Sequence, residues 1–287
     1  MGRLCMAVAV SAFLLGTAAL CDATAAARTI SGVVLDQHSG RPLAGLTVAS
    51  SPAGDPYDEA MAGDAPPNLA AVHVVTTASD GSFRIDTDSS SPQVFIDIYG
   101  APRGYVTFHG TFPAGAGALP AIHLIRPTVE ERRALAQINA FRRAPGGFAA
   151  FGTRQPLIFD QNLVATARYW AVEEARAGRI GHTCAQLGNP SGCVEFNAYF
   201  HRLPGAPQDD DAGQNAAFDS DPSWRDANRL FEIEGELCHF NWRACPSGPD
   251  GSQTQTGHYI NLMLAQRWIG LGEALAAAGA FFAQNLL

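Results

Sequence analysis

The spacing of apolar residues changes near residue 128, and this change divides the chain into two regions. Before it, short segments such as "FRIDTD" (83–88) and "QVFIDIYG" (93–100) alternate between apolar and polar residues. Such alternation indicates half-buried β-strands. After it, apolar residues such as Leu135 and Ile138 follow at helical spacing. The sequence therefore predicts an α+β protein with an all-β N-terminal region.

The C-terminal region carries several helix boundary signals. "TVEE" (128–131) is a capping box that starts a first helix. Asp160 is a predicted N-cap of a second helix, which Gly178 ends. A third helix is predicted over about 223–238. The stretch between the second and third helices reads as irregular, and the last segments, "RWIGLGEALAAAG" and "AFFAQNL", predict a terminal β-hairpin.

Residues 1–27 have the composition of a signal peptide. Arg3 precedes the apolar run "AVAVSAFLLGTAAL" (7–20), and "ATAAA" (23–27) offers small residues for cleavage. No later stretch is long and apolar enough to span a bilayer. We expect an exported protein, secreted or periplasmic, without a membrane span.

Four cysteines follow the signal peptide: Cys184, Cys193, Cys238 and Cys245. An even number in an exported chain predicts two disulfides, for which three pairings exist. The simplest pairing joins neighbours in sequence, Cys184 with Cys193 and Cys238 with Cys245. Zinc binding by these cysteines is disfavoured because the mature region contains no C-x-x-C.

Composition and motifs exclude several functions. The net charge of −8 argues against non-specific binding to nucleic acid. All 19 basic residues are arginine, which excludes a P-loop, a Schiff base and a Ser–Lys nucleophile. The chain also lacks a G-x-S-x-G elbow and an H-E-x-x-H helix. The absence of these motifs argues against enzymatic activity, which stays an alternative.

The N-terminal region contains "ISGVVLDQHSGRPLAGLTV" and the later "TTASDGSFRI". Eight residues in these two stretches follow a known motif: Gly32, Gly40, Pro42, Leu43, Gly45, Asp80, Gly81 and Phe83. Through them the region resembles a carboxypeptidase regulatory-like, or transthyretin-like, domain. This resemblance implies a β-sandwich over residues 28–126 that acts as an accessory module. Its histidines, His73, His109 and His123, are expected to be structural or exposed.

Residues 127–287 contain "GHYINLM" followed by "RWIGLGEA", and before them "ALAQINAFRR", "RIGHT" and "FEIE" with "CHFNWRAC". Through these motifs the region resembles the CAP superfamily of cysteine-rich secretory, antigen 5 and pathogenesis-related proteins (SCP-like domains). The first pair resembles the family signature and the strand after it, and the others resemble its helical motifs. The resemblance implies a CAP-type α-β-α sandwich with a central cleft.

The resemblance also implies the residues of that cleft: His182, Gln214, Glu234, His258 and Asn261. Gln214 stands where the family has a glutamate, which removes a carboxylate that a hard cation would prefer. Zinc held by His182, His258 and Glu234 is the metal alternative, and it would bind better near pH 8 than near pH 5 because the imidazoles must be neutral. The same side chains would otherwise form a hydrogen-bond network.

From these observations we expect a non-catalytic binding module for a small or apolar ligand, lipid-like or sterol-like. Two alternatives are kept. One is an extracellular hydrolase that uses the His/Glu cleft, and the other is a structural protein with a partner in the cell envelope.

Overall fold

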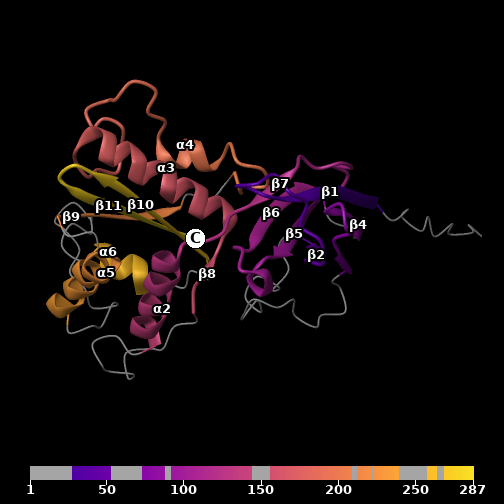
Figure 1. Ribbon diagram of the computed structural model, residues 1–287, viewed down its shortest axis with the longest axis horizontal. Coiled ribbons are helices and arrows are strands. Elements are labelled where there is room, and N and C mark those ends of the chain that lie inside the picture. Colours follow the sequence, from indigo (N-terminus) through magenta and orange to yellow (C-terminus); the bar gives the residue numbers. More distant parts are fainter. Residues whose placement is uncertain are drawn as a thin grey trace, which may run out of the picture.

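The computed structural model describes residues 28–52, 73–87, 92–143, 156–208, 212–220, 223–238, 257–263 and 268–287. The predicted signal peptide, residues 1–27, lies outside these ranges. The described chain is α+β. A β-sandwich is followed by a region in which helices cover both faces of a sheet (Figure 1).

Two sheets form the N-terminal region, as the alternating pattern predicts. The first has the order β4-β1-β7, with β1 (Arg28–Asp36), β4 (Ser82–Thr87) and β7 (Ile122–Leu124). The second has the order β3-β2-β5-β6, with β2 (Thr47–Pro52), β3 (His73–Thr76), β5 (Gln93–Tyr99) and β6 (Phe108–Pro113). A short 3-10 helix, η1 (Ala101–Arg103), leads into β6. Buried apolar residues from both sheets, such as Ile30, Val48, Phe83 and Ile96, form one core.

The "DGSF" turn shows why this region needs glycine at particular positions. Gly81 has a φ of +75°, and a Cβ atom there would lie 2.4 Å from the carbonyl oxygen of Val34. The preceding Asp80 accepts hydrogen bonds from the backbone N–H and the hydroxyl of Ser82. The turn therefore fixes the start of β4, and Phe83 enters the core directly after it.

The C-terminal region has three layers around a four-stranded sheet of order β8-β10-β11-β9. Its strands are β8 (Ile158–Phe159), β9 (Gly213–Asp219), β10 (Trp268–Ala276) and β11 (Gly279–Leu286). One face is covered by α3 (Gln161–Ala177) and α4 (Phe196–Phe200). The other is covered by α2 (Val129–Arg143), α5 (Trp224–Ile233) and α6 (Gly257–Met263) (Figure 1). The predicted terminal hairpin is present as β10 and β11, which pair antiparallel.

Helix boundaries follow the capping signals closely. Thr128 and Glu131 exchange two hydrogen bonds of 2.7 Å and 3.0 Å, which is the predicted capping box of α2. Asp160 accepts from the first N–H groups of α3, and Gly178 ends that helix with a φ of 65°. The third helix is shorter than predicted. α5 ends at Ile233 and continues as the 3-10 helix η4 (Glu234–Cys238).

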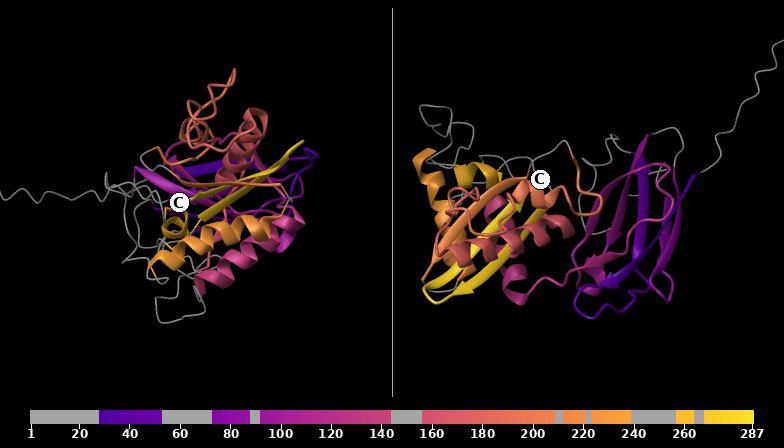
Figure 2. Two further views of the ribbon diagram at one scale, coloured as in Figure 1. Left: turned by 90° about the vertical axis from the view of Figure 1, so that its left-hand side faces the viewer. Right: turned by 90° about the horizontal axis from the view of Figure 1, so that it is seen from above.

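The two regions are joined by direct contacts, and Figure 2 shows them side by side. The backbone N–H of Thr107 donates to Phe159 at 3.2 Å, and that of Gln161 donates to Thr107 at 2.8 Å. His109 stacks on Trp268 with ring centroids 4.9 Å apart, and its Nδ1 lies 2.6 Å from buried Asp97. His109 therefore has a structural position between the regions, while His73 and His123 are exposed. The domain boundary near residue 126 stays a prediction.

Candidate ligand-binding site

Glu234, at the start of η4, holds both the ring and the backbone of His258. The Nδ1 atom of His258 lies 2.6 Å from Oε1 of Glu234. Oε2 accepts from the backbone N–H groups of His258 at 3.0 Å and Tyr259 at 3.3 Å. Because these N–H groups belong to the unpaired first turn of α6, the carboxylate caps that helix from outside. When the ring is neutral and Nδ1 donates to the carboxylate, Nε2 is an acceptor.

His182 reaches the same place from the loop after α3. The backbone N–H of the preceding Gly181 donates to Glu174 at 3.1 Å, and its carbonyl accepts from the indole of Trp170 at 2.8 Å. The Nδ1 atom of His182 lies 2.9 Å from Oε1 of Gln214 on β9. The ring centroids of His182 and His258 are 6.2 Å apart. Residues from a loop, a strand, α6 and η4 thus converge on one site.

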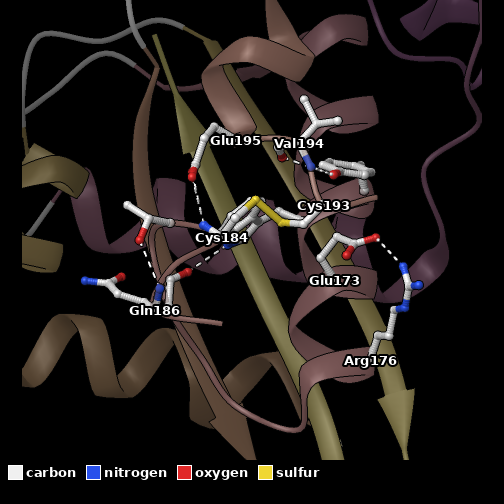
Figure 3. The surroundings of a disulfide bond; sticks show 11 residues. Glu173, Arg176, Cys184, Gln186, Cys193, Val194 and Glu195 are labelled. Atoms are coloured by element: carbon white, nitrogen blue, oxygen red, sulfur yellow. Dashed lines mark hydrogen bonds and ion pairs between the residues drawn. A yellow bond between two sulfur atoms is a disulfide. The ribbon is translucent and has the colours of Figure 1, made fainter. Parts of the chain in front are cut away.

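The disulfide between Cys184 and Cys193 fixes the loop that carries His182 (Figure 3). The backbone N–H of Cys184 also donates to both carboxylate oxygens of Glu195, each at 3.1 Å. This pairing was predicted and is confirmed. The second predicted pair, Cys238 with Cys245, lies partly outside the described residues, because Cys245 is not among them.

Buried amides connect the site to the sheet. The side-chain nitrogen of Asn215 donates to the carbonyl of His258 at 3.3 Å and to Gln284 at 3.2 Å. Asn261 donates to Asn215 at 3.0 Å, and Gln284 donates to Asn228 at 2.6 Å. Asn261 was predicted as a cleft residue. Asn215, Asn228 and Gln284 were not predicted. Gln284 could have been noticed as a buried polar residue, because it interrupts the apolar run "AFFAQNL".

Burial makes two carboxyl groups near the site weak acids. Burial raises the pKa of Glu174 to about 8, and the hydrogen bond that Gly181 donates lowers this pKa by less than burial raises it. Burial also raises the pKa of Glu232, on α5, to about 7. Glu174 is fully buried and its Oε2 atom has no hydrogen-bond partner in the described part of the chain. Glu174 is thus neutral at pH 7 and serves as an acceptor for the loop.

The zinc alternative stays a prediction. Within the described ranges, no three His, Cys, Asp or Glu side chains are arranged to hold one metal ion. Both oxygens of the Glu234 carboxylate already contact His258 or Tyr259, so in this structure the carboxylate orients the imidazole ring. The Gln214 side-chain nitrogen is buried and lacks a hydrogen-bond partner among the described residues.

A pocket of about 670 Å³ adjoins the His258–Glu234 pair. Its walls are mostly apolar and come from the end of α3, from β9, from α5 and from the β10–β11 hairpin. Ile180 and Leu230, on opposite sides of the sheet, are 47% and 51% exposed, so the mouth of the pocket is apolar as well. Arg179, Glu234 and His258 are its charged or titratable groups in the described part of the chain. An apolar cavity with a few convergent polar groups is typical of a ligand site.

Comparison with known proteins adds little to this geometry. No protein-family model matches the chain, and no curated protein matches its sequence. The shaft pilin SpaA from Lactobacillus rhamnosus GG is 12% identical over 36% of this chain, with a TM-score of 0.25, and the chain spans 48% of that protein. The 5-hydroxyisourate hydrolase of Klebsiella pneumoniae is 17% identical over 35% of this chain and 92% of its own, with a TM-score of 0.24.

None of the helices in the described ranges has the length and apolar character needed to cross a bilayer.

Proposed function

We propose that this chain is an exported binding protein whose C-terminal region is a CAP-type domain with a pocket for a small or apolar ligand. The observation that carries the proposal is the apolar pocket of about 670 Å³ beside the His258–Glu234 pair. Its apolar walls favour burial of an apolar ligand, at roughly 25 cal/mol for each Å² removed from water.

Several further features support this assignment. The three-layer arrangement agrees with the architecture that the CAP resemblance implies. His182, Gln214, Glu234, His258 and Asn261 all contribute to one connected site, as that resemblance predicts. The Cys184–Cys193 disulfide fits an oxidising compartment and therefore export. The N-terminal sandwich would serve as an accessory module.

Binding of a fluorescent acyl probe, 11-(dansylamino)undecanoic acid, tests the proposal. We expect saturable fluorescence enhancement with the wild-type protein. Leu230→Glu places a charge at the pocket mouth and should weaken binding by about tenfold or more. Ile233→Glu is the matched control, because Ile233 is 44% exposed on the same helix and does not line the pocket. Equal affinity in all three proteins would contradict the proposal.

The His258–Glu234 pair favours one second candidate, an extracellular hydrolase. A carboxylate that orients a neutral imidazole is the arrangement of a general base, and the 2.6 Å contact fits it. Turnover of a panel of peptide and ester substrates that is lost in His258→Ala would support this candidate. Probe binding without turnover of any of these substrates would support the binding function and contradict the hydrolase.

A further inference from the structure

Strand β9 lies at the edge of the four-stranded sheet, with β11 as its strand neighbour (Figure 1). Its residues pair antiparallel with β11, from Gly213 opposite Leu286 to Asp219 opposite Ala280. In an antiparallel pair, every second residue of an edge strand points its N–H and C=O away from the neighbour. These outward groups are donors and acceptors for another extended chain.

Gln214 identifies which residues of β9 point outward. Its carbonyl oxygen accepts from the side chain of Asn261 at 3.4 Å, outside the ladder with β11. By alternation, the next outward residues are Ala216 and Phe218. Within the described residues, neither of them makes a backbone hydrogen bond beyond that ladder. Two outward donors and two outward acceptors thus lie in sequence along this edge.

The pocket runs along this edge. Ala216, Ala217 and Phe218 are consecutive in β9 and all line it. Ile180 forms a wall on the α3 side of the sheet, and Leu230 forms the wall on the α5 side. The pocket is therefore a slot with a hydrogen-bonding floor and two apolar walls. We call it the β9 slot, lined by Ile180, Ala216, Ala217, Phe218 and Leu230.

We infer that the β9 slot binds an extended peptide, which adds to the sheet as a strand beside β9. This inference rests on the proposed binding function and names the ligand class. Main-chain hydrogen bonds to Ala216 and Phe218 would supply affinity, and alternate side chains would contact the two apolar walls. A fatty acid or sterol would cover the walls but leave the buried backbone groups unpaired, which is costly.

The polar groups of the pocket indicate which side chains the peptide carries. Arg179, Glu234 and His258 line it together with the apolar walls. The imidazole of His258 offers an acceptor or, when protonated, a donor. The preferred peptide therefore places a polar side chain near His258 and small or apolar residues beside Ile180 and Leu230.

Selection from a displayed library of random peptides, about nine residues long, tests this inference with the full-length protein. A selected peptide, synthesised with capped ends, is then titrated by calorimetry against wild type, Leu230→Glu and Ile233→Glu. We expect equal affinity for wild type and Ile233→Glu, and a loss of about tenfold or more for Leu230→Glu. The same peptide methylated on its backbone nitrogens should also lose about tenfold or more, because it cannot donate to β9.

Two results would overturn the inference. One is the enrichment of no peptide above the display background. The other is a selected peptide whose affinity is unchanged by Leu230→Glu or by backbone methylation. The acyl probe separates this failure from that of the proposed function. If the probe binds and Leu230→Glu abolishes that binding, but no peptide is selected, then the pocket binds apolar ligands and not peptides. Absence of both would refute the pocket as a binding site.

Discussion

The Nδ1 atom of His258 lies 2.6 Å from Oε1 of Glu234, and the other oxygen of that carboxylate accepts the backbone N–H groups of His258 and Tyr259. One side chain from η4 therefore sets the orientation of the imidazole and stabilises the start of α6. The geometry of the candidate site depends on the junction between α5 and η4, where Glu234 stands.

Replacing Glu234 with Gln should destabilise the protein. The amide keeps one oxygen acceptor but loses the second acceptor and the negative charge that α6 and His258 contact. We expect the free energy of unfolding in urea to fall by about 1–3 kcal/mol. Glu236→Gln is the matched control, since Glu236 is an exposed residue of the same 3-10 helix. An equal effect of the two substitutions would show that Glu234 does not support α6.

Replacing Gly270 with Ala should disrupt the packing of α3 on β10. A Cβ atom at Gly270 would lie 2.0 Å from the backbone carbon and oxygen of Leu163, so the helix would have to move. We expect a loss of about 2 kcal/mol or more in the free energy of unfolding. Gly115→Ala is the control, because a Cβ atom there would meet nothing within 4 Å. A Gly270→Ala protein as stable as the control would contradict this close approach.

Sequence signals predicted those parts of the fold that depend on local chemistry. The capping box at Thr128, the N-cap at Asp160 and the stop at Gly178 each satisfy backbone groups within a few residues, and all three are confirmed. The alternating strands of the N-terminal region were likewise recognisable. β6, which begins at Phe108, was missed.

Strand β9 was missed because its stability comes from distant partners. "GQNAAFD" is short and starts with polar residues, so it reads as part of an irregular stretch. In the structure, Asn215 is buried because Gln284 and Asn261 satisfy its amide. The convergence of His182, Gln214 and His258 could be expected from a family resemblance. The pocket beside them could not be expected, since its lining comes from five separate segments of the chain.

The raised pKa of Glu174 predicts a pH-dependent stability. Burial raises this pKa to about 8 in the folded protein, from the ordinary glutamate value of 4.5 that applies in the unfolded chain. Between these values the folded protein holds a proton that the unfolded chain has released. The free energy of unfolding therefore falls as the pH rises through this range.

Glu174→Gln removes this contribution while keeping an oxygen that accepts from Gly181. Between about pH 5 and pH 8, we expect wild type to lose roughly 3–4 kcal/mol more than the variant in urea unfolding. Glu130→Gln, at an exposed position on α2, should leave the pH profile of wild type unchanged. Parallel profiles for wild type and Glu174→Gln would show that Glu174 is not a protonated, buried acid.

The Cys184–Cys193 disulfide should stabilise the loop that carries His182. A double substitution, Cys184→Ser with Cys193→Ser, should lower the free energy of unfolding by about 2–3 kcal/mol in the chain-entropy model. It should also weaken binding of the acyl probe, because Ile180 of the same loop lines the pocket. Non-reducing peptide mapping checks the pairing directly, and a link from Cys184 to Cys238 would contradict it.

Methyl NMR of the full-length protein titrated with 11-(dansylamino)undecanoic acid tests the central claim most directly. The account predicts saturable shifts at the methyl groups of Ile180, Ala216, Ala217 and Leu230, which line the pocket beside His258. Leu275, which is exposed and outside this lining, should not shift. Leu135 and Leu157 line a separate cavity between α2 and β8 and serve as a second reference. Shifts confined to Leu135 and Leu157, or no saturable shift at all, would contradict a binding site beside His258.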